Sequence, residues 1–279
     1  MHAPLRAEIP VLVECPHAGL DVPASLASVV AGPESARRRD ADFAVDRLCE
    51  GVCEVGATRL VAQLSRYVVD LNRAPDDIDP FLHGASFDRR GPPKGVVWRV
   101  ATDGRPIARR PLSPDEVRAR VDAYHRPYHD ALASTLTSMR TRFDHVVMLA
   151  VHSMPSIGKI PGTDDVVRRA DVVPGTRGRT TAAVPFIDEV DTFFRAEGFS
   201  VRHDDPYRGG YSTALYGRPD RGVHAIQIEL SRGLYLDEPQ LRIREADVAR
   251  LRDAINRLVE RLGMLATEFG KAGSGDERR

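Results

Sequence analysis

The chain has 279 residues, of which 42% are hydrophobic, enough for a substantial core in one large α/β domain or two ordinary ones. Forty basic residues balance forty acidic ones, which excludes the strong basic bias of nucleic-acid-binding proteins. No apolar run approaches the roughly 18 residues of a membrane span. We therefore expect a globular protein without nucleic-acid or membrane partners, and the sequence does not specify an oligomeric state.

The first ten residues carry charges and no apolar segment of the kind found in a signal peptide. The three cysteines, Cys15, Cys49 and Cys53, show no Cys-x-x-Cys spacing, which argues against a disulfide framework or a thiolate zinc site. Both observations favour a cytoplasmic protein.

Strand-like apolar runs alternate with helical patterns along the chain. The predicted strands are Ile9–Cys15, Thr58–Ala62, Tyr67–Leu71, Val146–Val151, Ser200–Arg202 and Val223–Leu230. The predicted helices are Asp40–Glu54, Ser113–Arg140, Val184–Ala196 and Pro239–Leu265. This alternation predicts an α/β fold with a mixed, mainly parallel central sheet flanked by helices.

The helix predicted over Ser113–Arg140 has a clear start and an expected irregularity. It opens with Ser-Pro-Asp-Glu, a capping box with proline at the first helical position. Pro127 lies inside it and should kink or split the helix near Arg126.

Two long segments, Ala74–Leu112 and Ser153–Ala183, lack clear periodicity and are rich in Pro, Gly, Asp and Arg. Loops of this length in a compact domain are usually functional or mobile. We interpret them as walls or lids of an active site, with surface insertions as the alternative. We expect residues 1–269 to form a single domain and residues 270–279 a disordered tail.

Histidines stand at the ends of two predicted strands. His17 follows the first apolar run and His152 follows Val146–Val151. Open α/β sheets bind ligands at the carboxyl ends of their strands, so the two imidazoles could meet across a metal ion. Either residue alone could also be a hydrogen-bonded structural histidine.

Glu229 ends an apolar run that should be a central strand. An unpaired charge there is costly, so this carboxylate needs a partner or a chemical role. The role in a metal hydrolase is general base; the alternative is an ion pair with Arg232 or Arg66.

The segment Arg66-Tyr-Val-Val-Asp-Leu-Asn-Arg73 is an apolar run that begins and ends with arginine. A guanidinium keeps its proton and is shaped to bind carboxylates. We expect the two arginines to meet anions, either a substrate or structural partners. His125 and His129 form a rival metal pair, weakened by the intervening Pro127 and the absence of a His-Glu-x-x-His motif.

A series of motifs follows in order along the chain, from about Val11 to Glu238. The series comprises Pro16-His17-Ala-Gly, Asp42-Phe43, Ser65-Arg66-Tyr67, Asp70-Leu-Asn-Arg73, Arg126-Pro-Tyr-His129, His152-Ser-Met-Pro155, Gly209-Gly-Tyr211 and Gln227-Ile-Glu229. This series resembles the N-formylglutamate amidohydrolase family and, more distantly, the zinc carboxypeptidases and aspartoacylases.

The resemblance implies the fold of the zinc carboxypeptidases and a Zn²⁺ ion, or another divalent metal, held by His17, His152 and a carboxylate. In the distant relatives that carboxylate lies three residues after the first histidine, where this chain has Leu20. The family's Asp-Phe pair implies Asp42 instead, with Asp46 and Asp21 as competitors.

The resemblance also assigns roles to the remaining residues. Glu229 corresponds to the catalytic glutamate, Arg66 would polarise the scissile carbonyl, and Asn72 with Arg73 would bind a substrate carboxylate. His129 and Tyr211 would line the pocket or orient a ligand.

The activity implied is hydrolysis of an N-acyl acidic amino acid, specifically N-formyl-L-glutamate to formate and L-glutamate, a step in histidine degradation. The alternatives are a broader N-acyl amino acid or small-peptide hydrolase and an inactive ligand-binding homologue. N-formylglutamate has a second carboxylate, which requires a further cation. The candidates are Lys159, Arg168, Arg169, Arg177, Arg179 and Arg208.

Overall fold

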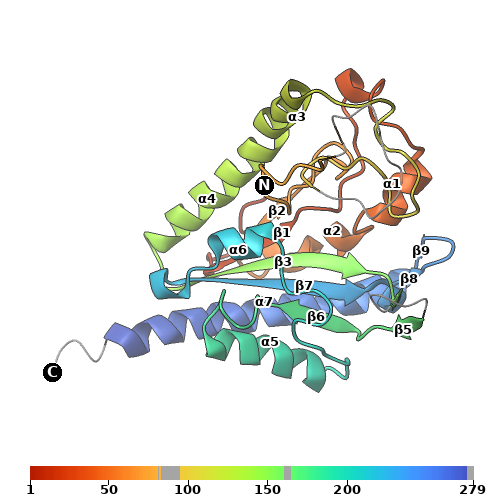
Figure 1. Ribbon diagram of the computed structural model, residues 1–279. Helices are drawn as coiled ribbons and strands as arrows, with labels where there is room; N and C mark the ends of the chain where they lie inside the picture. The colour runs from red at the N-terminus through yellow and green to blue at the C-terminus, as the bar shows by residue number, and fades with distance from the viewer. Residues whose placement is uncertain (81, 83–94, 160–164, 275–279) are drawn as a thin grey trace. The chain divides into compact units, whose positions relative to one another are not determined.

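The computed structural model describes residues 1–80, 82, 95–159 and 165–274. The strands are β1 Val11–Cys15, β2 Thr58–Val61, β3 Val146–Met154, β4 Ile157–Lys159, β5 Val166–Arg168, β6 Val172–Gly175, β7 Val223–Ser231, β8 Leu236–Asp237 and β9 Arg242–Ile243. The α-helices are α1 Glu34–Asp40, α2 Val45–Leu48, α3 Pro114–Arg120, α4 Arg126–Arg140, α5 Val184–Ala196, α6 Tyr211–Tyr216 and α7 Glu245–Ser274. Figure 1 labels these elements.

The chain forms two compact units. Unit 1 contains residues 1–15, 44–60 and 135–279, and unit 2 contains residues 16–43 and 61–134. None of the described helices combines the length and apolar character that a membrane crossing requires.

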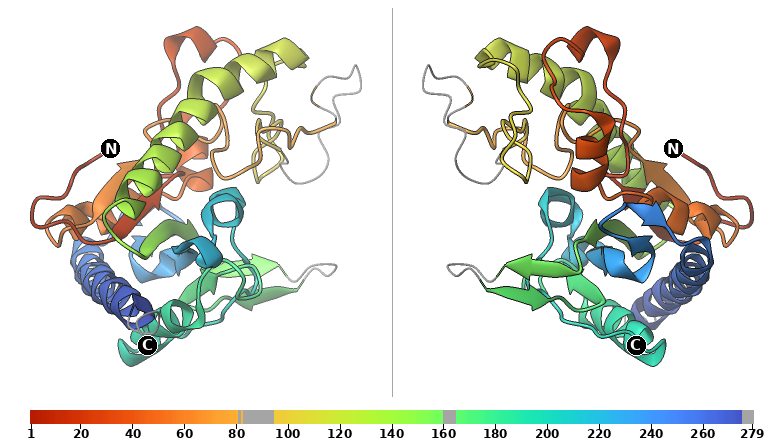
Figure 2. Two further views of the ribbon diagram at one scale, coloured as in Figure 1. Left: turned by 90° about the vertical axis from the view of Figure 1, so that its left-hand side faces the viewer. Right: turned by 90° about the vertical axis from the view of Figure 1, so that its right-hand side faces the viewer.

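A five-stranded sheet in the order β2-β1-β3-β7-β6 organises unit 1. β1, β3 and β7 are parallel, and β6 is antiparallel to β7. Helices α5 and α7 lie along one face of the sheet, while the short α6 lies over the other (Figures 1 and 2). This architecture confirms the predicted mixed, mainly parallel sheet with flanking helices.

The central strands are apolar because the sheet is covered on both faces. All nine residues of β3 and eight of the nine in β7 are buried. β3 therefore extends beyond the predicted end at Val151 and includes His152. β6 was not predicted, since it lies within the aperiodic segment Ser153–Ala183.

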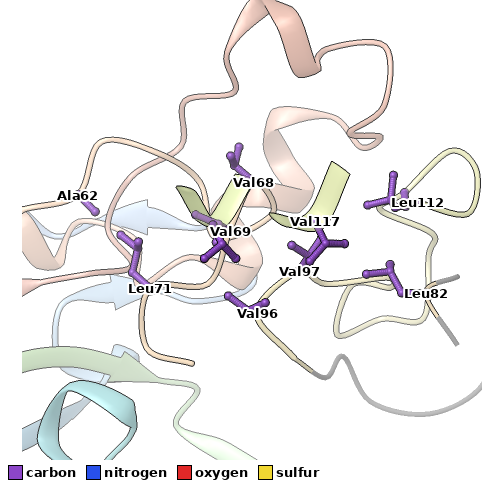
Figure 3. Packing of buried hydrophobic residues seen from close by; sticks show 11 residues of the cluster. Ala62, Val68, Val69, Leu71, Leu82, Val96, Val97, Leu112 and Val117 are labelled. Atoms are coloured by element: carbon purple, nitrogen blue, oxygen red, sulfur yellow. The ribbon is translucent and has the colours of Figure 1, made fainter. Parts of the chain in front are cut away.

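Unit 2 has a core made from loops and from the helices α1 and α3. Val68, Val69 and Leu71 pack with Val96 and Val97 in this core. Figure 3 shows Val69 near the middle of the cluster. The long segment Ala74–Leu112 is thus partly a source of core residues, although residues 81 and 83–94 lie outside the described part.

The strand predicted over Tyr67–Leu71 is wrong, because this segment is a series of turns. Side-chain oxygens accept hydrogen bonds from backbone N–H groups that would otherwise pair with a neighbouring strand. Ser65 Oγ accepts from Tyr67 N at 3.3 Å, and Asp70 Oδ1 accepts from Asn72 N at 3.0 Å. Such local hydrogen bonds compete with strand pairing.

Two further predictions need correction. The helix predicted over Asp40–Glu54 is broken by Ala44, whose φ of 65° is left-handed. Beyond Asp40, the last residue of α1, this range is helical only over Val45–Leu48 and in a 3₁₀ turn at Glu50–Cys53. The strand predicted over Ser200–Arg202 is a single bridge between Val201 and Val172.

The interruption predicted at Pro127 is confirmed. A π-helical turn, Val121–His125, separates α3 from α4 directly before Arg126. Proline lacks the N–H that would continue the α-helical ladder. The capping box is also present, since Ser113 Oγ accepts from Glu116 N and the Glu116 side chain accepts from Ser113 N. α7 runs beyond the predicted end to Ser274, and residues 275–279 of the expected tail lie outside the described part.

A pair of histidines lies near the amino-terminal ends of β3 and β7. His224 Nδ1 accepts from Ala183 N at 3.1 Å, and its Nε2 lies 3.0 Å from His145 Nδ1. Burial lowers the pKa of His224 to about 3 and also lowers the pKa of His145. Both rings are therefore neutral in the folded protein near neutral pH.

We expect the free energy of unfolding to fall as the pH drops below about 6.5, the ordinary histidine pKa. Below this pH, His224 binds a proton in the unfolded chain but stays neutral in the folded protein. His224→Leu should make this decline shallower, by up to about 1.4 kcal/mol per pH unit between pH 6 and 4. Urea unfolding at a series of pH values measures the slopes. Equal slopes for the variant and the wild type would contradict the conclusion that His224 is neutral in the folded protein.

Candidate active site

The first group of predicted site residues lies in unit 2, around His17. His17 follows the end of β1 by two residues and is buried. Its backbone carbonyl accepts a hydrogen bond from Asp42 N at 2.9 Å. Its ring Nδ1 lies 3.5 Å from Asp42 Oδ2, and its Nε2 lies 2.7 Å from Asp70 Oδ1.

These distances fix the direction of each nitrogen of His17. In the contact with the Asp70 carboxylate Nε2 carries the proton, so the neutral ring has its lone pair on Nδ1. The separation of 3.5 Å between Nδ1 and Asp42 Oδ2 is long for a direct hydrogen bond. Two ligands bound 2.0–2.2 Å from a tetrahedral zinc ion are separated by roughly 3.4 Å. The pair therefore fits a metal ion that lies between them.

Asp70 is a fully buried carboxylate that accepts from several donors. Besides His17, Oδ2 accepts from Arg66 Nη2 at 2.7 Å and from Trp98 Nε1 at 2.9 Å, and Oδ1 accepts from Asn72 N. Burial alone would raise the pKa of Asp70, but Arg66 and His17 outweigh it and hold the pKa well below its ordinary range. Asp70 is thus an anion at neutral pH.

Arg66 is fixed from several sides. Its guanidinium pairs with Asp70, donates to the Asp40 carbonyl at 3.3 Å and stacks on Trp98 at 4.3 Å from the ring centre. The prediction that the arginines of this segment meet anions is confirmed for both. Arg73 lies 3.7 Å from the Asp77 carboxylate, and the side chains of this pair are nearly half exposed.

His125 and His129 support the Asn72–Arg73 segment. Their rings are 4.3 Å apart, and their Nε2 atoms lie 2.9 Å from the carbonyls of Arg73 and Leu71 respectively. Burial lowers the pKa of His129 to about 4, so it is neutral and donates to Leu71. The geometry does not favour the rival metal pair, since these nitrogens point to backbone oxygen atoms.

The second group lies in unit 1, on the parallel strands β3 and β7. His152 and Glu229 are register partners on these neighbouring strands. Paired residues of neighbouring strands, about 4.8 Å apart, direct their side chains to the same face of the sheet. Both residues are buried, so the sheet itself brings a histidine and a carboxylate together.

Gln227 connects Glu229 to a glycine turn. Its Nε2 donates to Glu229 Oε1 at 2.9 Å, and its Oε1 accepts from Gly210 N at 2.9 Å. Tyr211 follows this turn as the first residue of α6. Gly175 permits the close approach, because a Cβ at this position would lie 2.6 Å from Gly209 N.

Sequence reasoning gave no role to Gln227 and did not connect Asp70 with His17. Gln227 could have been found, because residues i and i+2 of a strand share a face and Glu229 was already a candidate. The bond from Asp70 to His17 spans 53 residues and leaves no local pattern.

The competitors for the carboxylate beside His17 lie elsewhere. Asp21 is exposed, and Asp46 belongs to α2 in unit 1, where burial raises its pKa. Within unit 2, Asp42 is the carboxylate whose oxygen faces Nδ1 of His17.

The mixed sheet defines an α/β protein that carries a buried histidine and a buried carboxylate on neighbouring strands. The model of the N-formylglutamate amidohydrolase family matches residues 9–236. The chain therefore belongs to this family, as its motifs predicted.

Similar proteins support this placement. A Pseudomonas aeruginosa protein named N-formylglutamate deformylase is 33% identical over 92% of this chain and 94% of its own length. A Pseudomonas putida protein of the same name is 28% identical over 84% of this chain and 85% of its own. The crystal structure of N-formylglutamate amidohydrolase from Ralstonia eutropha has a TM-score of 0.83 and 31% identity, covering 97% of both chains.

Proposed function

We propose that this protein is a metal-dependent hydrolase that converts N-formyl-L-glutamate to formate and L-glutamate. The observation that carries the proposal is the family match over residues 9–236. The names of the two Pseudomonas relatives supply the substrate. The test is release of formate from N-formylglutamate by the purified protein.

In this proposal His17, Asp42 and His152 hold a divalent metal ion, most simply zinc. All three are buried, and each can offer one ligand atom. Two imidazoles and one carboxylate are a common protein ligand set of catalytic zinc, which keeps a further position open. Asp70 on the second nitrogen of His17 is the type of outer contact that orients a metal-binding histidine.

The metal would polarise the scissile carbonyl and lower the pKa of water at the site. Glu229 would then act as the general base: it takes a proton from the attacking water and gives it to the leaving amide nitrogen. The amide of Gln227 donates to the Glu229 carboxylate, which orients this carboxylate.

Arg66, Asn72 and Arg73 would act on the substrate. Arg66 carries a permanent charge held in place by Asp70 and Trp98, suited to stabilising negative charge that develops on the carbonyl oxygen. Asn72 and Arg73 would bind a substrate carboxylate. The histidines behind this segment, His125 and His129, hold its backbone in position.

The metal assignment predicts roughly one divalent ion per chain in protein purified without chelators. The double variant His17→Ala/His152→Ala should lose the ion, because it removes both imidazole ligands. Elemental analysis by mass spectrometry provides the measurement. Retention of stoichiometric metal by the double variant would exclude this site.

Asp70→Asn should weaken metal binding by roughly 10- to 100-fold, the usual effect of losing an outer contact to a ligand histidine. Asp79→Asn is the matched control, because Asp79 also pairs with a buried arginine, Arg99, at 3.0 Å in unit 2. Both variants should lower stability, since each leaves an arginine uncompensated. Only Asp70→Asn should change metal affinity in a competition titration with a chelator, and equal affinities would contradict the role of Asp70.

Glu229→Gln should leave metal content and KM nearly unchanged while kcat falls by roughly two orders of magnitude or more, because the amide cannot accept the proton. Arg73→Ala should mainly raise KM, since a hydrogen bond to a charged group contributes roughly 1.5–3 kcal/mol. Steady-state formate release gives both constants. A similar small loss in both variants would refute this division of roles.

A further inference from the structure

The glycine turn Gly209–Gly210 is firmly connected to the proposed general base. Gly210 N donates to Gln227, and Gln227 donates to Glu229. Groups that are fixed on this turn therefore have a defined position relative to Glu229. Arg177 is such a group, because its Nη1 donates to the carbonyl of Gly209 at 3.1 Å.

The loop that carries Arg177 has an unusual backbone. Arg177, Gly178 and Arg179 are three consecutive residues with left-handed φ values of 53°, 77° and 63°. Only glycine adopts this region readily. Non-glycine residues in such conformations are concentrated at ligand-binding and catalytic sites, where the surrounding structure enforces them.

Side chains hold this conformation in place. The Asp204 carboxylate accepts from Thr176 N at 2.8 Å and from Gly178 N at 2.5 Å. The Thr176 hydroxyl accepts from Arg179 N at 3.2 Å. Arg177 N itself donates to the Arg208 carbonyl at 2.7 Å, directly before the glycine turn. The position of Arg177 is therefore built into the loop.

The guanidinium of Arg177 has different partners from that of Arg179. Over the described ranges it forms no ion pair with a carboxylate, whereas its neighbour Arg179 pairs with Asp188 at 2.5 Å. A guanidinium has five N–H donors in a planar fork that matches a carboxylate. One of these donors binds the Gly209 carbonyl, and the remaining N–H groups can donate to an anionic ligand.

The other basic candidates have different positions. Arg169 donates to the Pro155 carbonyl and lies 5.3 Å from the ring centre of Tyr207. Lys159 and Arg168 belong to the two-stranded sheet β4–β5. Arg208 contributes its backbone carbonyl to Arg177, but no hydrogen bond of its guanidinium to the turn is seen among the described residues.

We propose that Arg177 binds the side-chain carboxylate of the substrate and so determines selectivity for acidic N-formyl amino acids. This inference rests on the proposed function, in which Asn72 and Arg73 bind the other carboxylate. The turn Gly209–Gly210 sets the position of Arg177 relative to Glu229, and hence relative to the amide bond.

The experiment compares N-formylglutamate with N-formylglutamine, which has nearly the same shape but lacks the second carboxylate. The ratio of kcat/KM values for the two compounds should exceed ten for the wild type. Arg177→Met keeps the apolar stem and should reduce this ratio roughly ten- to hundredfold, mainly through KM for N-formylglutamate. Metal content should stay unchanged, and the rate on N-formylglutamine should change far less than the rate on N-formylglutamate.

Arg179→Met is the matched control, because Arg179 lies in the same loop with the same left-handed backbone but is paired with Asp188. It should keep the wild-type ratio. An unchanged ratio in Arg177→Met, or a loss of selectivity in Arg179→Met or Arg208→Met instead, would overturn the assignment.

A failure of the proposed function can be distinguished from a failure of this inference. If the wild type hydrolyses neither compound, the reaction is wrong, and calorimetric binding of the same two compounds still tests Arg177. Preferential binding of N-formylglutamate that disappears in Arg177→Met supports the inference. Equal affinity of the wild type for both compounds overturns it.

Discussion

The organisation of unit 2 around the predicted site depends on one buried carboxylate, Asp70. A charge without exposure to water requires compensation, and Asp70 obtains it from Arg66 and from the donors of His17 and Trp98. These contacts fix both the direction of the His17 ring and the position of the guanidinium. A single desolvated anion thus orients a proposed metal ligand and a proposed oxyanion-stabilising group together.

In unit 1 the same task is performed by sheet geometry. Parallel pairing of β3 and β7 places His152 level with Glu229 without any special loop. Because the register is defined over nine pairs, eight of them with both residues buried, a shift of either strand would move an entire apolar face. The relative position of these two side chains is therefore as stable as the core itself.

The sequence predicted the parts of this arrangement that depend on local periodicity. The strands that carry His152 and Glu229 and the helix Val184–Ala196 follow directly from apolar runs and helical spacing. The segment Tyr67–Leu71 also has the composition of a strand, yet it forms turns, because Ser65 and Asp70 bind its backbone groups. An apolar run indicates burial, and the competition between side-chain and ladder hydrogen bonds decides its conformation.

Local sequence patterns could not predict the hydrogen bonds that buried polar groups make with distant segments of the chain. The links from Asp70 to His17 and Trp98 join segments far apart in the chain, and the left-handed conformation of Arg177–Arg179 is enforced by Asp204 from another loop. The family resemblance favoured Asp42 over Asp46 and Asp21, and the distance from Asp42 to His17 supports this choice. Each of these features depends on tertiary contacts, whereas the motifs supplied the residues that take part.

The residues proposed for catalysis and the residue proposed for selectivity lie on different kinds of structure. His152 and Glu229 lie on central strands, where substitutions of neighbouring residues disturb a packed core. Arg177 lies on a surface loop whose shape depends on a few hydrogen bonds to Asp204 and Thr176, and loops tolerate sequence change better than strands do. A hydrolase with the proposed roles could acquire a different acyl-amino-acid preference through the loop while His152 and Glu229 remain in place on the sheet. Under the proposed roles, the choice between a narrow N-formylglutamate hydrolase and a broader N-acyl amino acid hydrolase would depend on Arg177 and its turn, since His152 and Glu229 would serve either enzyme equally.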